Sequence, residues 1–209
     1  KDPDKYKTSI DVFKTTFEFL GLQILEIRDV PINPKVLSPI AQENMPKIIQ
    51  AIIKRPDHCR TLESFDKLLY FAKQKVRTKQ KDKGISGEFY FSSLSSRSIV
   101  YKALSTSAQL EEFYLDLKDP KYKANFVVFH RRFSTNTKSS WDKVQPFRLI
   151  AHNGEINTIE GNRSAAISRE KAIGLQMDEL ITREGSSDSG NFNGMVEAVP
   201  YLETLDESR

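Results

Sequence analysis

Residues 125–137 read NFVVFHRRFSTNT, and residues 147–158 read FRLIAHNGEINT. Each stretch begins with apolar residues rich in aromatic or branched side chains, which predict a strand, and then reaches a histidine and a run of hydrogen-bonding side chains. Polar residues that directly follow a buried strand are presented by a rigid scaffold, where ligands are commonly bound. The two stretches therefore predict a fold that contains a sheet, with a polar site where two of its strands end.

The rest of the chain alternates predicted strands with predicted helices. Besides residues 125–130 and 148–152, strands are predicted over residues 47–53, 88–94 and 98–102. Helices are predicted over residues 10–20, with Ser9 as the cap and Gly21 as the stop, from Thr61 onward, and from near residues 107, 157 and 187. This order indicates an α+β fold or a layered α/β sandwich and argues against a helical bundle.

The composition fits one domain or slightly more. The length of 209 residues suffices to bury a core, and the net charge of +4 permits nucleic-acid binding without indicating it. A single cysteine, Cys59, excludes an internal disulfide and a cysteine-rich zinc site, so a reducing compartment fits best. No stretch approaches the roughly 18 apolar residues of a membrane span, and the polar start is unlike a signal peptide. Because the chain opens with Lys1 and reaches no methionine before Met45, we expect it to be a piece of a longer protein.

Residues 73–83 carry six cationic side chains against one acidic side chain, Asp82. Such a segment either binds phosphates or a partner, or forms the solvated end of a helix whose dipole favours cations there. No aromatic residue is interleaved with the lysines. We therefore expect a solvated helix end followed by a loop, and no nucleic-acid partner.

Several polar side chains after the predicted strands have two readings. Arg132 could hold a carboxylate through two parallel hydrogen bonds. Asn153 and Gly154 suit an oxyanion hole, although Asn-Gly is also a leading signal for a tight turn. Asp188 either faces a ligand amine or, with Ser187, caps a helix.

The histidines and the cysteine give weaker indications of chemistry. His58, His130 and His152 are not spaced as metal ligands, so no metal site is expected, and the last two are more typical of structural residues at strand ends. His58 stands beside Cys59, which suggests a Cys–His nucleophile, but neighbours in a polar loop seldom aim at one atom. An inert cysteine is the favoured reading.

Four motifs together resemble the amino-terminal amidotransferase domain of the glutamate synthase large chain. They are Arg132-Phe-Ser-Thr-Asn-Thr, Gln145-Pro-Phe-Arg, Ala151-His-Asn-Gly-Glu-Ile-Asn-Thr and Ser187-Asp-Ser. Ser140-Trp141, Gly161-Asn162 and the segment from Ser93 to Lys102 extend the resemblance, which is strongest over residues 88–199. Ala103 and Arg131 depart from the family pattern, where glycine and a small residue are usual.

The resemblance implies a role for each motif residue. Arg132 would bind the α-carboxylate of glutamine and Asp188 its α-ammonium group, with Thr135 and Asn136 also in the substrate site. Asn153 and Gly154 would form the oxyanion hole. The family fold is an N-terminal nucleophile hydrolase sandwich of four layers, αββα, with two antiparallel sheets. Its nucleophile is an amino-terminal cysteine, which is absent from this chain, so the fold would be incomplete at its N-terminus.

By the same resemblance, residues 1–209 would be most of one glutaminase domain that supplies ammonia for glutamate synthesis from 2-oxoglutarate. The partners would be glutamine and the later synthase domains, with no nucleic acid and no membrane, in the cytoplasm or a plastid. Flavin mononucleotide and an iron–sulfur cluster would belong to those later domains and not to this segment. The alternatives are the glutaminase domain of another class II amidotransferase, or a binding module that retains the glutamine pocket without catalysis.

Overall fold

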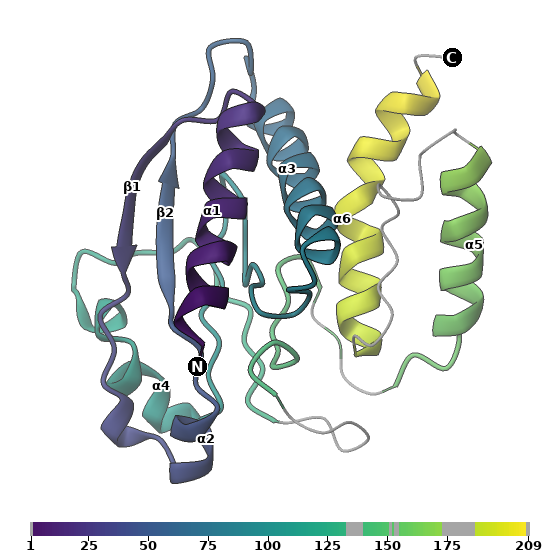
Figure 1. Ribbon diagram of the computed structural model, residues 1–209. Helices are drawn as coiled ribbons and strands as arrows, with labels where there is room; N and C mark the ends of the chain where they lie inside the picture. The colour runs from purple at the N-terminus through teal and green to yellow at the C-terminus, as the bar shows by residue number, and fades with distance from the viewer. Residues whose placement is uncertain (1, 133–139, 151, 153–154, 173–186, 208–209) are drawn as a thin grey trace.

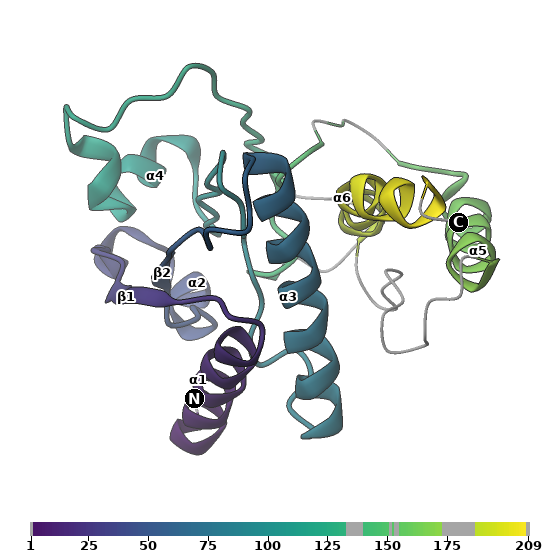
Figure 2. The same cartoon turned by 90° about the horizontal axis from the view of Figure 1, so that it is seen from above.

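Helix α1 (Pro3–Phe19) lies on one face of a two-stranded antiparallel sheet and packs against a second long helix, α3 (Leu62–Asp82), in the computed structural model of the chain (Figures 1 and 2). The sheet is formed by β1 (Ile24–Asp29) and β2 (Ile49–Ile53). The structure describes residues 2–132, 140–150, 152, 155–172 and 187–207, with backbone alone from 199 onward. The fold is α+β, as predicted, although β1 was not among the predicted strands.

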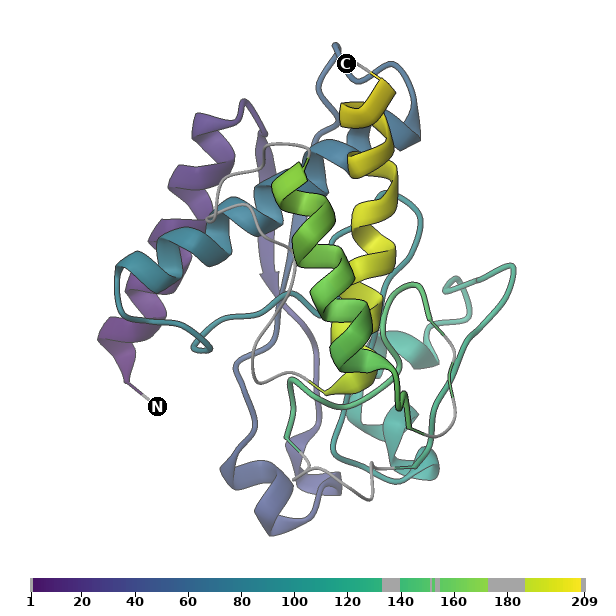
Figure 3. The same ribbon diagram turned by 90° about the vertical axis from the view of Figure 1, so that its right-hand side faces the viewer.

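The remaining elements form two groups, one at an end of the sheet and one beside α3. The short helices η1 (Pro34–Val36), α2 (Pro39–Glu43), α4 (Ser107–Phe113) and η2 (Leu115–Lys118) gather at one end of the sheet. The helices α5 (Ile159–Ala172) and α6 (Asp188–Glu207) lie side by side, with α6 next to α3 (Figures 1 and 3). The predicted helix starts near residues 107, 157 and 187 are confirmed to within two residues. Among the described residues, no helix combines the length and the apolar character that crossing a membrane requires.

Helix α1 begins earlier than predicted. Its cap is Asp2, whose carboxylate accepts a hydrogen bond from the backbone N–H of Asp4 at 3.0 Å. Ser9 is therefore not the cap but a buried residue inside the helix. Gly21 ends the helix region as predicted, with a φ of +69° that side chains larger than hydrogen disfavour.

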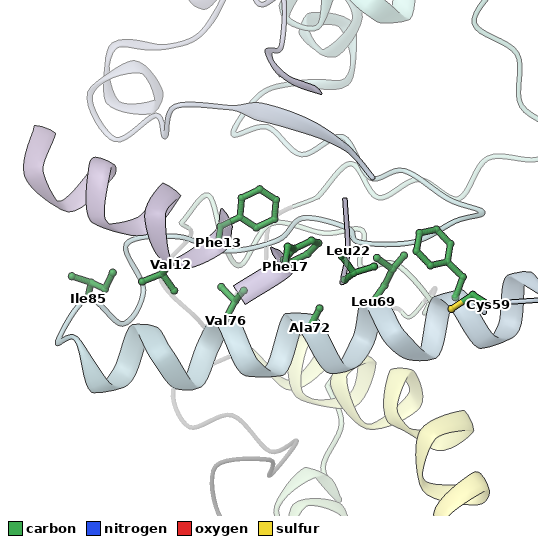
Figure 4. Close-up of a cluster of buried hydrophobic side chains, with 10 residues drawn as sticks. Val12, Phe13, Phe17, Leu22, Cys59, Leu69, Ala72, Val76 and Ile85 are labelled. Carbon is green, nitrogen blue, oxygen red and sulfur yellow. The ribbon is translucent and has the colours of Figure 1, made fainter. Parts of the chain in front are cut away.

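Helix α3 begins where the sequence predicts it. The Thr61 hydroxyl accepts a hydrogen bond from the Ser64 N–H at 3.1 Å, and the Ser64 hydroxyl accepts one from the Thr61 N–H at 3.2 Å. This reciprocal pair is a capping box. The apolar face of the helix then packs against α1, and Phe13, Phe17 and Val76 are at most 2% exposed (Figure 4).

A second hydrophobic cluster surrounds Phe113, which is completely buried. Trp141 packs against Phe113 with a centroid separation of 5.8 Å, and its indole N–H donates to the backbone carbonyl of Ala41 at 3.1 Å. Trp141 therefore fixes the start of the segment that leads to the AHNGEINT motif.

Four predicted strands do not form ladders in the described part of the chain. Residues 88–94, 98–102, 125–130 and 148–150 have no strand assignment. In the first, the rings of Phe89 and Phe91 pack against Phe13 of the core instead. In the third, Phe126 and Phe129 are 81% and 76% exposed, because no other described segment pairs with this stretch. The strand signal of these residues is local, whereas a strand needs a partner. The four-layer sandwich is accordingly not confirmed by this structure.

The capping box generates a test of the fold. Replacing Thr61 with alanine should lower the free energy of unfolding by about 1 kcal/mol, because the Ser64 N–H at the start of α3 loses the hydroxyl that accepts its hydrogen bond. Denaturant titration of the protein measures this change. The control is Thr15→Ala, since Thr15 is exposed within α1 and its hydroxyl bonds to the Asp11 carbonyl of its own helix. Equal losses in both variants would contradict a capping role for Thr61.

Candidate functional site

Helix α6 begins with Asp188, which the sequence analysis places in the ligand site. The cap is Ser187, whose hydroxyl accepts a hydrogen bond from the Gly190 N–H at 3.2 Å. Asp188 is therefore the first helical residue, is half-buried, and its carboxylate is not needed as the cap. The two readings of this segment are compatible, because different side chains would perform them.

A buried polar stripe runs along α6 from this start. Ser189, Asn193 and Glu197 follow one another at intervals of four residues, so they lie on one side of the helix, and they are only 5%, 6% and 7% exposed. The Ser189 hydroxyl accepts from the Gln145 side chain at 3.4 Å, and the side-chain Oδ1 of Asn193 accepts from the Leu149 backbone N–H at 2.9 Å. We refer to Ser189, Asn193 and Glu197 as the polar stripe.

The last member of the polar stripe, Glu197, is held between two cations. One carboxylate oxygen pairs with the ammonium group of Lys73 on α3, and the other accepts from Arg148 Nε at 2.9 Å. The Glu197 side chain is 4% exposed, and those of Lys73 and Arg148 are 13% and 15% exposed. Lys73 thus departs from the solvated helix end predicted for residues 73–83, although Lys79 and Lys81 do lie in the last turn of α3.

Burial alone would raise the pKa of the Glu197 carboxyl. The charges and hydrogen bonds of Lys73 and Arg148 more than offset burial, so the pKa lies below its ordinary value. Glu197 is therefore an anion at neutral pH in a nearly dry environment.

The segment between Trp141 and the polar stripe has its own anchor. The Lys102 ammonium group donates to the backbone carbonyl of Asp142 at 3.2 Å and lies 4.3 Å from the centre of the Phe147 ring. The Lys102 carbonyl in turn accepts from the buried hydroxyl of Tyr114. Residues 141–149 are thus tied to the second hydrophobic cluster at one end and to α6 at the other.

Of the six predicted site residues, the structure describes Arg132 and Asp188. Arg132 is exposed and forms no ion pair with any described residue. Thr135, Asn136, Asn153 and Gly154 lie outside the described residues. The roles of all six residues remain predictions.

Comparison with known proteins decides the family. The sequence profile described as glutamine amidotransferases class-II matches residues 1–203. The chain belongs to the class II glutamine amidotransferases. It is 42% identical over 186 residues to ferredoxin-dependent glutamate synthase 2 of Synechocystis, covering 85% of this chain and 12% of that protein.

Two further relatives carry similar names. The chloroplastic ferredoxin-dependent glutamate synthase of rice, Oryza sativa, is 40% identical over 175 residues, which cover 83% of this chain and 11% of that protein. The glutamate synthase [NADPH] large chain of Azospirillum brasilense is 35% identical over 195 residues, covering 90% and 13%. The chain therefore spans only a small part of the length of the relatives it matches.

Other side chains with possible chemistry in this amidotransferase chain have structural surroundings. Cys59 is 4% exposed and belongs to the hydrophobic cluster between α1 and α3, where it is inaccessible to substrate (Figure 4). The Nδ1 atom of His152 is buried without a hydrogen-bond partner in the described part of the chain. Among the described residues, no group of three His, Cys, Asp or Glu side chains could hold a metal ion.

The polar stripe was missed by the sequence analysis. Phe192, Met195 and Val196 of this helix are only half-buried, whereas the side chains of the polar stripe are buried. The available signal was the recurrence of Ser, Asn and Glu every four residues from residue 189. Such a recurrence on a helix is read as solvent-exposed by default, because polar side chains are rarely buried without partners.

The lowered pKa of Glu197 predicts how stability responds to pH. At pH 7, Glu197→Gln should lower the free energy of unfolding by about 3 kcal/mol, because it removes the buried carboxylate charge that pairs with both Lys73 and Arg148. A group whose pKa is lowered by folding stabilises above its ordinary value, here 4.5, and loses that contribution as pH falls through the folded value. The gap between variant and wild type should therefore shrink below pH 4.5.

Urea titrations of both proteins over a pH series measure this gap. The control is Glu112→Gln, which removes the carboxylate of an exposed pair with Lys118, and a small change without this pH trend is expected. A gap for Glu197→Gln that stays constant down to acid pH would contradict the ionised state assigned to Glu197.

Proposed function

We propose that residues 1–209 are most of the glutaminase domain of a glutamate synthase. This domain binds glutamine and supports the release of its amide nitrogen as ammonia, which the parent protein uses to make glutamate from 2-oxoglutarate. The observation that carries the proposal is the membership in the class II amidotransferases, together with relatives that are glutamate synthases and match 83–95% of this chain.

In this proposal, two charged residues recognise the amino-acid end of glutamine. The exposed guanidinium of Arg132 binds the α-carboxylate, and Asp188 binds the α-ammonium group. The structure supports these roles to the extent that the Arg132 side chain is accessible and that Ser187, not Asp188, caps α6. Thr135 and Asn136 complete the substrate contacts.

Asn153 and Gly154 form the oxyanion hole of the proposed site. Donors at such a position stabilise the negative charge that develops on the amide oxygen when the nucleophile attacks. The nucleophile is an amino-terminal cysteine outside these 209 residues, and its own α-amine acts as the base. Attack by the thiolate gives a tetrahedral intermediate, from which ammonia departs before water hydrolyses the thioester to glutamate.

The complete domain is proposed to have the four-layer sandwich of the N-terminal nucleophile hydrolases. The segment with exposed Phe126 and Phe129 supports this proposal, because its strand-forming sequence is left without a partner strand among the described residues. Pairing with further strands of the same domain would bury these side chains.

The cofactors of the parent protein are proposed to lie in other domains. An iron–sulfur cluster is held by several cysteine thiolates, and this chain has one cysteine, so its residues do not fit such a group. Flavin mononucleotide is likewise assigned to the later synthase domains, which are the proposed partners of this one. The parent protein is placed in the cytoplasm or, as the name of the rice relative indicates for that protein, in a plastid.

The substrate roles of Arg132 and Asp188 can be tested in the full-length protein. Arg132→Ala or Asp188→Ala should lower kcat/KM for glutamine, by an amount that corresponds to a loss of roughly 2–4 kcal/mol of transition-state stabilisation. The reason is that each variant removes one partner of a charge pair with the substrate. Steady-state kinetics measure the effect. Arg131→Ala is the matched control, since Arg131 is the neighbouring exposed arginine and has no assigned role. Changes below about threefold in both site variants would overturn these roles.

The source of the nucleophile gives a second test. The 209 residues alone should release no ammonia from glutamine, because Cys59 is the one thiol in the sequence and is buried in the core. A longer chain that begins at the proposed cysteine should be active. Both are assayed for ammonia, with Cys59→Ser in each. Activity of the 209 residues that disappears in Cys59→Ser would make Cys59 a nucleophile and refute the proposal.

A further inference from the structure

Glu197 is a buried acidic residue that the proposed chemistry does not use. Exchanging a buried ion pair for apolar side chains of similar size is often neutral or stabilising, so stability alone does not explain a charge at this place. An ion pair does add a defined geometry, because a carboxylate fixes the positions of the groups that donate to it. The question is which part of the molecule Glu197 orients.

The contacts of Glu197 join three parts of the chain. Lys73 belongs to α3, which packs against α1 in the main hydrophobic cluster. Arg148 belongs to the segment that enters the AHNGEINT motif, and its guanidinium also reaches the Ser95 hydroxyl at 3.4 Å. Glu197 therefore ties this segment and α6 to the helix pair that packs in the main hydrophobic cluster.

The same segment and helix are joined at two further points of the polar stripe. Asn193 accepts from the Leu149 backbone N–H, and Ser189 accepts from the Gln145 side chain. The contact at Ser189 is next to Asp188, and a helical rise of about 1.5 Å per residue places Glu197 only about 14 Å along the axis from Asp188. A short rigid helix transmits an orientation set at Glu197 to its first turn.

We propose that Glu197 is a positioning residue of the glutamine site: held by Lys73 and Arg148, it sets the orientation of α6, and hence of Asp188, relative to residues 145–150. Glu197 touches neither substrate nor reacting atoms in this role and acts through Arg148 and the backbone of α6. The inference rests on the proposed function and adds to it the contacts that hold Asp188 in place relative to residues 145–150.

The test uses the full-length protein with three variants. Glu197→Gln removes the charge at constant size, and Glu197→Asp retains the charge on a shorter side chain. Val76→Ala is the control for lost stability, because Val76 is fully buried between α1 and α3 and lies outside the polar stripe. All are assayed well below their unfolding temperatures for kcat and KM of glutamine hydrolysis, and for hydrogen exchange of the peptide that contains Leu149.

A displaced Asp188 binds glutamine less well, whereas a partly unfolded protein merely contains fewer active sites. Glu197→Gln should therefore raise KM for glutamine by about tenfold or more, since misplacements near 1 Å have large effects on active-site function. Faster exchange at residues 145–150 should accompany it. Glu197→Asp should recover part of the loss, and Val76→Ala should leave KM and this exchange unchanged. If Glu197→Gln does not fold, Asn193→Ala is used in its place. This variant removes the acceptor of the Leu149 N–H hydrogen bond and leaves the Glu197 ion pairs intact.

Two results would overturn the inference, and they differ in kind. An unchanged KM in a folded Glu197→Gln or Asn193→Ala protein, with wild-type glutaminase intact, would make the polar stripe purely structural. A full-length wild type that does not hydrolyse glutamine would refute the proposed function, and the positioning role would fall with it.

Discussion

The arrangement of this chain depends on one buried carboxylate, that of Glu197, between Lys73 and Arg148. The larger apolar side chains described on α6, those of Phe192, Met195 and Val196, are only half-buried, and the fully buried Ala198 is small, so hydrophobic packing alone places the helix weakly. The ion pairs and the hydrogen bonds of Ser189 and Asn193 supply the direction that packing lacks. These contacts hold α6 and the loop before the AHNGEINT motif in fixed positions relative to α1 and α3.

Several residues of the family motifs make structural contacts in addition to matching the family pattern. Trp141 is anchored on Ala41 and Phe113, and Phe147 lies under the ammonium group of Lys102. Arg148 pairs with Glu197. A family motif thus combines residues proposed to contact substrate with residues that hold the loop in place. This combination explains why the resemblance covers a long stretch around a small set of chemical groups.

The parts of the fold that the sequence predicted are those specified locally. Thr61 and Ser64 lie three residues apart and cap the helix together. The apolar residues of α3 recur with the period of a helix, which can be recognised within this segment alone. The strand predicted around Phe126 needed a partner that local sequence does not identify. Lys73 looked like part of a solvated basic run because its partner, Glu197, lies 124 residues further along the chain. For the site, residue types and the family resemblance suggested Arg132 and Asp188, but the recurrence of Ser189, Asn193 and Glu197 did not reveal that these side chains are buried, because their partners lie on other segments.

The burial of Cys59 has a practical consequence for work on the complete protein. A thiol that is 4% exposed within an apolar cluster is shielded from solvent-borne alkylating agents while the domain stays folded. This region therefore contributes little background to selective labelling of cysteines elsewhere in the polypeptide. Conversely, the appearance of a reactive thiol in the peptide around Cys59 would report local unfolding of the hydrophobic cluster that contains this residue.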